Sequence, residues 1–285
     1  AGHDVMVYAY PPVTQDWRGA RVCPVTAEGP IARGLWLRSK IMRDRPDVVV
    51  MHYAGTDTFS LSWTGIPLVV SAWGSDILRD LVSHPIKKKL VSLGLRRADL
   101  VVSPAVHMTE RIVSMGVHAE RILTVQYGVD TKVITPQGGV QPTPVRVVST
   151  RSLAPVYRVA DLVDAVADLD SEAVKEVRVV GDGPLASDLR DRAKRIDGET
   201  AVKFLGRLDH EAVLEELHAA DIYVSTSESD GASLSLIEAM ACGLPSVVTD
   251  IPASREWIDG SCGLLVPVGV PHQLAEAICR LANDL

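Results

Sequence analysis

The chain has 285 residues, of which 47% are apolar, and carries a net charge of −7 with an isoelectric point near 5.6. This size suits two domains, and the acidic balance argues against a general nucleic-acid binder, which would carry a basic face. The four cysteines form no CxxC pair and no Cys/His cluster with zinc-like spacing, so neither a disulfide framework nor a structural metal site is expected.

Strand-like apolar runs alternate with amphipathic segments through the first half of the chain. The runs lie at residues 5–9, 48–52, 68–72 and 100–103. Because strand and helix patterns alternate, they predict a parallel sheet covered by helices.

A local basic stretch lies in this first half of an otherwise acidic protein. Lys87, Lys88 and Lys89 are followed by Leu90 and Leu93 at helical spacing. Such a helix could rest on an anionic membrane as a peripheral contact, or it could present an ordinary solvated face.

Proline, glycine and polar residues suspend both periodicities in the segment PQGGVQPTP, residues 136–144. We therefore predict a first domain over residues 1–136, a linker over 137–144 and a second domain over 145–285.

The second half repeats the alternation of strand and helix. Its apolar runs lie at residues 145–150, 177–181, 222–226 and 245–249. The predicted fold class is therefore α/β, with two Rossmann-like parallel-sheet domains.

The most informative stretch is VSTSESDGASLSLIEAMACGLPSVVT, residues 224–249. A strand leads into a polar, glycine-containing break, and from Leu234 the apolar residues recur at helical spacing. Asp230 precedes the helix, and Glu238 follows two turns later, so both carboxylates can face one ligand that has a charged end and hydroxyls. Alternatively, Asp230 is only an N-cap and Glu238 a solvated helix residue. The amides that would open the helix as an anion site belong to Gly231, Ala232, Ser233 and Leu234.

The spacing of Asp230 and Glu238, followed by AMACGLPSVVT, resembles the E-x7-E signature of the retaining glycosyltransferases of family four, the group 1 glycosyl transferases. The resemblance covers nearly the whole chain and implies a GT-B fold, in which two Rossmann-like domains face each other across a cleft. Asp230 stands where the family has a Glu. Both ends are shorter than the family pattern, because G-H-D-V already stands at residues 2–5 and the last helix that crosses back to the first domain is not found.

The resemblance assigns donor-site roles in the second half. It implies that Asp230 lies by the donor sugar, that Glu238 holds the ribose and that the intervening amides bind diphosphate and sugar. Arg151 matches the Arg of the family's GRLxxxKG phosphate clamp, and Arg158 is the favoured substitute for its missing Lys, with a solvated helix-start residue as the alternative. GDGP at residues 181–184 and FLG at 204–206 resemble loops that approach the nucleotide, which implicates Gly183 and Leu205; a plain strand end is the alternative for FLG.

The first half is the acceptor-binding domain in the family that it resembles. His52 ends a predicted strand there, although a lone histidine is more often structural. Trp73 replaces a family His that contacts the donor sugar, so it either stacks on a sugar ring or packs. Asp76 is expected to orient acceptor hydroxyls.

The predicted enzyme is a retaining, metal-independent hexosyltransferase that moves a sugar from a nucleotide-diphosphate sugar to an acceptor hydroxyl in glycan, glycolipid or glycosylated-metabolite synthesis. Its co-substrate is the nucleotide sugar, with a UDP-sugar favoured, and no other cofactor is expected; a magnesium or manganese site at Glu228 and Asp230 is the less favoured alternative. The acceptor is a sugar, a lipid-linked molecule or a small molecule. A nucleotide-sugar epimerase and a noncatalytic nucleotide-sugar-binding protein stay open as alternatives.

No run is long enough for a membrane span and no signal pattern is visible, so a cytoplasmic location is expected.

Overall fold

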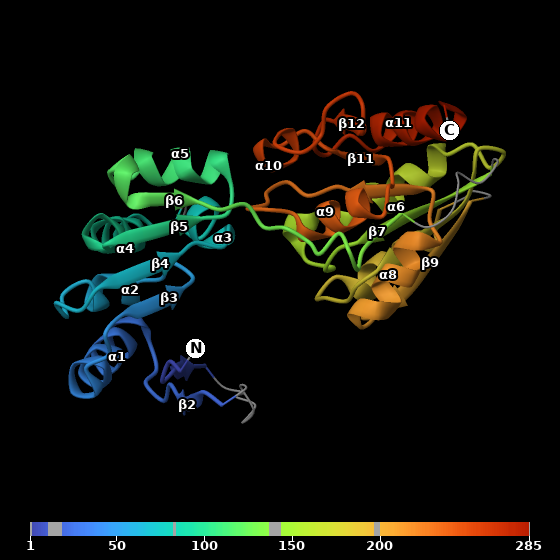
Figure 1. Cartoon of the computed structure of the whole chain (residues 1–285). Coiled ribbons are helices and arrows are strands. Elements are labelled where there is room, and N and C mark those ends of the chain that lie inside the picture. The colour runs from blue at the N-terminus through green and yellow to red at the C-terminus, as the bar shows by residue number, and fades with distance from the viewer. Residues whose placement is uncertain (1, 11–18, 82–83, 137–143, 197–199, 285) are drawn as a thin grey trace. The chain divides into compact units, whose positions relative to one another are not determined.

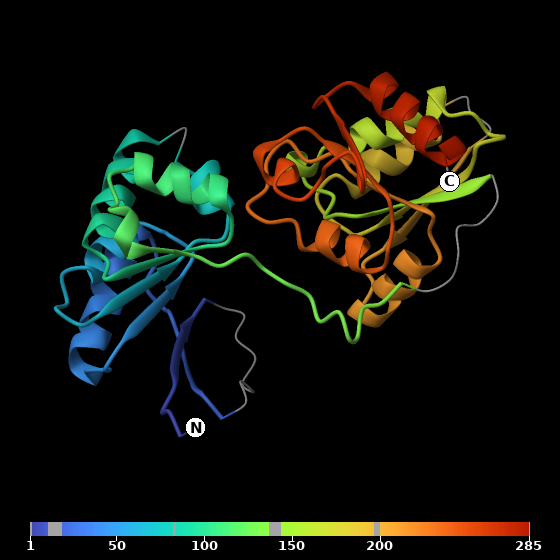
Figure 2. The same ribbon diagram turned by 45° about the horizontal axis from the view of Figure 1, so that its top comes forward.

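The computed structural model describes residues 2–10, 19–81, 84–136, 144–196 and 200–284. The chain divides into two compact units, Ala1–Val125 and Gln126–Leu285. Figures 1 and 2 show the elements of each unit, and each unit is considered by itself.

The units divide earlier in the chain than the sequence analysis places the domain boundary. Residues 126–136, predicted as the end of the first domain, belong to the second unit because Ile134 is buried in one of its cores and Pro136 lies against Gly243. The predicted linker, residues 137–144, lies outside the described residues except for Pro144.

Unit 1 contains a four-stranded parallel sheet in the order β3-β4-β5-β6. A parallel pair of strands, β1 and β2, precedes it. The strands are β1 (Met6–Ala9), β2 (Arg21–Pro24), β3 (Val49–His52), β4 (Leu68–Ser71), β5 (Leu100–Ser103) and β6 (Ile122–Thr124).

The helices of unit 1 alternate with these strands, as the sequence predicts. Helix α2 packs against α1 and α4, and α3 packs against α5. A core that includes Val70, Val101 and Ile112 joins them to the sheet. The helices are α1 (Pro30–Asp44), α2 (Asp57–Leu61), α3 (Ser75–Leu78), α4 (Pro85–Arg97), α5 (Val106–Ser114) and the 3-10 turn η1 (Ala119–Arg121).

Unit 2 contains a six-stranded, fully parallel sheet in the order β12-β11-β10-β7-β8-β9. Its first strand in the chain, β7, lies in the middle, so the strand order reverses between β7 and β10. Ligands of open α/β sheets bind outside the carboxyl ends of the strands at such a reversal. The strands are β7 (Val145–Thr150), β8 (Val174–Val180), β9 (Ala201–Gly206), β10 (Ile222–Ser225), β11 (Ser246–Thr249) and β12 (Gly263–Val266).

Both faces of the unit 2 sheet are buried. Successive residues of a strand point to opposite faces, and Val147 and Val148 accordingly belong to different cores. One core gathers residues of α6, α7 and α11, and the other gathers residues of α8 and α9. The helices are η2 (Pro155–Tyr157), α6 (Val159–Ala165), η3 (Val166–Asp168), α7 (Ala186–Ala193), α8 (His210–His218), α9 (Leu234–Ala241), α10 (Pro252–Arg255) and α11 (Pro271–Asp284).

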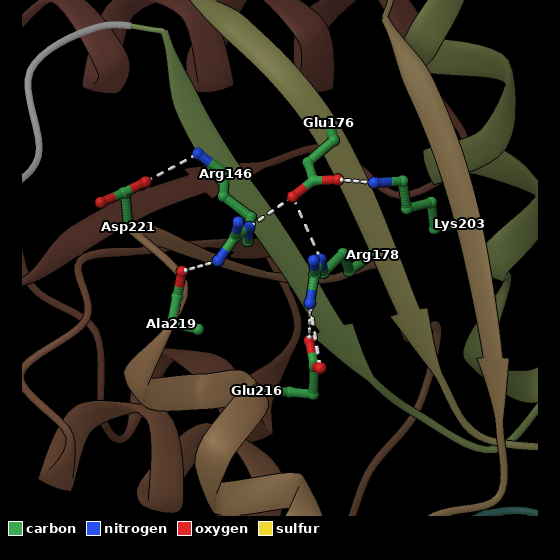
Figure 3. Close-up of polar contacts among 7 residues, drawn as sticks. All are labelled: Arg146, Glu176, Arg178, Lys203, Glu216, Ala219 and Asp221. Atoms are coloured by element: carbon green, nitrogen blue, oxygen red, sulfur yellow. Dashed lines mark hydrogen bonds and ion pairs between the residues drawn. The ribbon is translucent and has the colours of Figure 1, made fainter.

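A cluster of charged side chains ties three strands of unit 2 to α8 (Figure 3). Glu176 of β8 is 6% exposed, and its carboxylate accepts from Arg146 of β7 at 2.5 Å and from Arg178 at 3.1 Å. Lys203 of β9 lies 2.5 Å from its second oxygen. Arg178 also donates to Glu216 of α8 at 2.7 and 3.0 Å. Burial alone would raise the pKa of Glu176, but Lys203, Arg146 and Arg178 together lower it to about 2.

Candidate functional site

Arg151 lies one residue beyond the end of β7, at the reversal point of the unit 2 sheet. Its side chain is 8% exposed. Nη1 donates to Ser233 Oγ at 2.9 Å and to Ser235 Oγ at 2.7 Å, and Nη2 donates to a carboxylate oxygen of Asp230. Since these partners follow β10, which pairs with β7, the contacts join the two loops at which a ligand is expected.

The surroundings of Arg151 keep it charged. Burial works to lower the pKa of the guanidinium, but the charge of Asp230, its hydrogen bond and the nearby Tyr223 and Tyr157 together raise the pKa. The guanidinium carbon also lies 4.3 Å from the centre of the Tyr157 ring. Its Nε is buried and finds no hydrogen-bond partner among the described residues. A permanent cation with one unused donor therefore stands at the predicted diphosphate position.

The loop after β10 leads into α9 as the sequence predicts, but the N-cap of α9 is not Asp230, which was the alternative interpretation of that residue. Ser233, not Asp230, is the N-cap residue, and its hydroxyl accepts from Arg151 instead of capping the helix. The Ser233 carbonyl accepts from the amides of Leu236 and Ile237. Of the four residues predicted to supply amides, Gly231 and Ser233 are buried, Ala232 is half-buried and Leu234 is 46% exposed. The mouth of α9 therefore opens beside the Arg151–Asp230 ion pair.

Glu238 lies in the second turn of α9, with its side chain 18% exposed. Burial raises the pKa of its carboxyl, and His210 partly offsets this effect. His210 begins α8, and its Nδ1 lies 3.7 Å from a carboxylate oxygen of Glu238. Sequence reasoning missed His210, although its place just after the N-cap Asp209, close behind β9, could have drawn attention to it.

Arg158, predicted as the second cation, is already held by carboxylates. It lies at the start of α6 with a positive φ of 44°, and it donates to both oxygens of Asp161 at 2.7 and 3.0 Å. The hydrogen bond to Asp161 raises the pKa of Arg158. A carboxylate oxygen of Glu228, from the loop after β10, lies 3.9 Å from Nη1 of Arg158. The structure thus brings Arg158 toward the loop that carries Asp230, but its guanidinium is already hydrogen-bonded to Asp161.

Gly183 lies where no side chain fits. A Cβ atom at this position would stand 2.6 Å from the Leu153 carbonyl oxygen, so the loop after β8 rests directly on the segment that follows Arg151. Gly181 has a φ of 139° and donates its amide to the carbonyl of Gly206 at 2.8 Å. Leu205, the residue before Gly206, is half-buried and packs against the core beneath α8. The GDGP and FLG segments therefore meet at the carboxyl edge of the sheet.

The three acceptor-side candidates meet in unit 1. His52 and Trp73 are both exposed and make an edge-to-face contact, with ring centres 5.9 Å apart. Asp76 is fully buried, and it accepts from the backbone amides of Ala54, Trp73 and Gly74. Its predicted role in orienting acceptor hydroxyls stays a prediction that this burial disfavours, because its oxygens already bind the backbone.

Within the described ranges, no group of three or more His, Cys, Asp or Glu side chains is arranged to hold a metal ion. None of the helices in the part of the chain that the structure covers combines the length and the apolar character needed to span a bilayer.

Comparison with known proteins agrees with this architecture. Residues 1–128 match the family model for the glycosyl transferase 4-like domain, and residues 144–284 match the model for glycosyl transferases group 1. N-acetyl-alpha-D-glucosaminyl L-malate synthase of Bacillus anthracis is 27% identical over 85% of this chain and 67% of that enzyme. Sulfoquinovosyl transferase of Arabidopsis thaliana is 27% identical over 98% of this chain, which spans 60% of that enzyme.

Among solved structures, the Anabaena protein HepE in complex with UDP superposes with a TM-score of 0.78 at 20% identity, over 93% of this chain and 78% of HepE. This likeness extends through both parallel-sheet units, as expected for the GT-B fold. From its two matching domain models and its fold, the chain belongs to the group 1 glycosyl transferases.

Proposed function

We propose that the protein transfers a glycosyl group from a nucleotide-diphosphate sugar to an acceptor hydroxyl, with retention of the anomeric configuration. One observation carries this proposal: the buried Arg151, paired with the partly buried Asp230, lies beside the N-terminus of α9 at the strand reversal of unit 2. A cation, helix amides and a carboxylate in one place suit a ligand that has a diphosphate and a hydroxylated ring.

Departure of the diphosphate is the step that needs electrostatic help. As the bond between the anomeric carbon and the phosphate oxygen breaks, Arg151 and the first amides of α9 would stabilise the charge that develops on the phosphate. The acceptor oxygen would bond to the anomeric carbon on the same face, and its proton would pass to the leaving phosphate oxygen. This route needs no protein nucleophile, which explains why the site requires only charged and hydrogen-bonding groups.

The ion pair gives Asp230 a defined part in this scheme. A diphosphate that approaches the Arg151 guanidinium competes with Asp230 for its Nη2 donor. The phosphate would then replace Asp230 as a partner of the buried cation, and the released carboxylate would accept from hydroxyls of the donor sugar. Glu238, further along α9, would hold the pentose.

We propose a UDP-sugar as the donor and a reaction that needs no metal ion. HepE, which shares the fold, has been solved with UDP and with UDP-glucose. Arg151 and the α9 amides are positive groups that a diphosphate can contact, and Arg158 lies nearby but is paired with Asp161.

The test is incubation of the purified protein with UDP-glucose, GDP-mannose and ADP-glucose, each with and without a panel of saccharide acceptors. Acceptor-dependent release of nucleoside diphosphate and an α-linked product by NMR are the expected results, and they should persist in EDTA. Isomerised sugar would indicate an epimerase, and binding without turnover a noncatalytic protein; either result contradicts the proposal.

Variants assign the activity to the site. Arg151→Lys keeps the charge but loses the geometry that contacts two serines and Asp230, so turnover should fall by about 100-fold. Arg192→Lys makes the same substitution at a half-exposed ion pair with Asp164 and should leave turnover unchanged. Equal activity of both variants would contradict the assignment of Arg151.

We also propose a peripheral membrane contact through α4. Ile86 is 77% exposed, and Lys88 and Lys89 are exposed beside it, whereas Lys87 lies 3.4 Å from Asp80. Co-sedimentation with phosphatidylglycerol vesicles, but not with phosphatidylcholine vesicles, is expected and should weaken at high salt. Binding that is unchanged in the Lys88→Gln, Lys89→Gln double variant would contradict it.

A further inference from the structure

Two tryptophans of unit 1 are about equally exposed but are covered very differently. Trp63 is 51% exposed, and the guanidinium of Arg97 lies over its ring at 3.7 Å from the centre. Trp73 is 54% exposed, and the ring contact it makes among the described residues is an edge-to-face contact with His52. The face of Trp63 is therefore occupied within the protein, whereas Trp73 presents a broad apolar surface to solvent.

Trp73 is part of a group that we call the aromatic edge, formed by His52, Tyr53 and Trp73. His52 and Tyr53 come from the end of β3, and Trp73 comes from the end of β4, which is its neighbour in the sheet. Tyr53 is 38% exposed. Three exposed rings thus meet at the carboxyl edge of the unit 1 sheet, the side at which α/β folds bind their ligands.

The backbone and side-chain arrangement of the aromatic edge costs free energy by itself. Tyr53 has a φ of 76°, which a bulky residue rarely adopts. Asp76 is fully buried, and it fixes both loops by accepting from Ala54 at 2.7 Å after β3 and from Gly74 at 2.8 Å after β4. The strained backbone of Tyr53 and the buried carboxylate of Asp76 both hold exposed rings in a fixed position. Strain of this kind is typical of a binding surface.

Polar groups border the rings on one side. The Tyr53 hydroxyl donates to Asp80 at 2.6 Å and lies 3.1 Å from Ser75 Oγ. The Asp80 side chain is 35% exposed, and Lys87 lies 3.4 Å from it. A pyranose ring has one face of C–H bonds and a rim of hydroxyls, so it matches an aromatic face bordered by a carboxylate and a hydroxyl. The carboxylate also disfavours an anionic ligand.

We propose that the aromatic edge binds a hexopyranose ring, with Trp73 as the stacking residue. In the transfer reaction this ring would be the acceptor, and that part of the inference rests on the proposed function. The binding itself does not, because it involves unit 1 alone.

The experiment measures binding of methyl β-D-glucopyranoside and methyl β-D-galactopyranoside to the full chain by saturation-transfer NMR and titration. The Trp73→Ala variant should lose about tenfold in affinity, the size expected from one lost aromatic stacking contact. The matched Trp63→Ala variant removes an equally exposed indole and should bind like the wild type. Trp73→Phe keeps an aromatic face and should recover most of the affinity, which separates stacking from a folding defect.

Several results would overturn the inference. They are no binding of either pyranoside to the wild type, an equal loss in the Trp63→Ala and Trp73→Ala variants, and binding of L-malate in preference to both pyranosides. Failure of the proposed function is distinguishable, because it would appear as a wild type that neither binds UDP nor releases it from UDP-glucose. If UDP-glucose is turned over but the acceptor KM is the same in Trp73→Ala and wild type, the function stands and the role of the aromatic edge is wrong.

Discussion

Replacing Glu176 by Gln should remove a large part of the stability of unit 2. The carboxylate is 6% exposed, and its three cationic neighbours lower its pKa from the ordinary 4.5 to about 2. Each pKa unit corresponds to about 1.36 kcal/mol, so the ionised carboxylate stabilises the folded state by about 3 kcal/mol at neutral pH. This figure is an upper value, because Lys203 is 52% exposed and water screens its share.

The sign of the pH dependence sharpens the test. A lowered carboxyl pKa contributes stability that is fully present above 4.5 and is lost as the pH falls toward 2. Urea unfolding, followed by circular dichroism, should therefore show the largest difference between wild type and Glu176→Gln at neutral pH, and the difference should shrink below pH 4.5. Asp191→Asn, which breaks an exposed pair with Lys194, is the control and should change little. A Glu176→Gln variant as stable as the wild type at pH 7, or a difference that grows on acidification, would refute the reasoning.

Three further predictions follow from individual contacts. Gly183→Ala should destabilise the protein by about 2 kcal/mol in urea unfolding because its Cβ would meet the Leu153 backbone, whereas Gly260→Ala, with open space around it, should not. Asp76→Asn should cost about 2 kcal/mol, since an amide nitrogen would replace one of the oxygens that accept from backbone amides; equal unfolding midpoints would contradict this. The raised pKa of Glu238 predicts that UDP affinity, measured by calorimetry, falls on acidification already above pH 4.5, and that Glu238→Gln removes this dependence.

Most strands could be predicted from the sequence, and those that were missed share a location. The runs at residues 5–9, 48–52, 68–72 and 100–103 became β1, β3, β4 and β5, the runs of the second half became β7, β8, β10 and β11, and FLG at 204–206 ends β9. Strands β2, β6 and β12 escaped prediction, and each is an edge strand. An edge strand is covered less completely, so it keeps charged or small residues, such as Arg21 in β2 and Gly263 in β12, and lacks the continuous apolar pattern of a central strand.

The candidate site was predictable in its position but not in its pairings. Arg151 and Asp230 both follow strands, so the rule for the carboxyl ends of parallel strands suffices to place them at one edge. The rule does not say that Arg151 also binds Ser233 and Ser235, or that Arg158 binds Asp161. Arg151 and its serine partners are more than 80 residues apart in sequence. Such pairings depend on side-chain packing and on competition between neighbouring acids, which no local pattern records.

Both units use the same physical device to order their strand-end loops. In unit 1 the buried Asp76 binds backbone amides after β3 and after β4, and in unit 2 the buried Arg151 binds side chains of the loop after β10, next to its own β7. A charge in the interior is stable only with its partners in place, so each buried group enforces one arrangement of two neighbouring loops. Loops ordered in this way need not be ordered by a ligand, which reduces the entropic cost of binding. The stability and the ligand affinity of each edge should therefore fall together when its buried charge is removed.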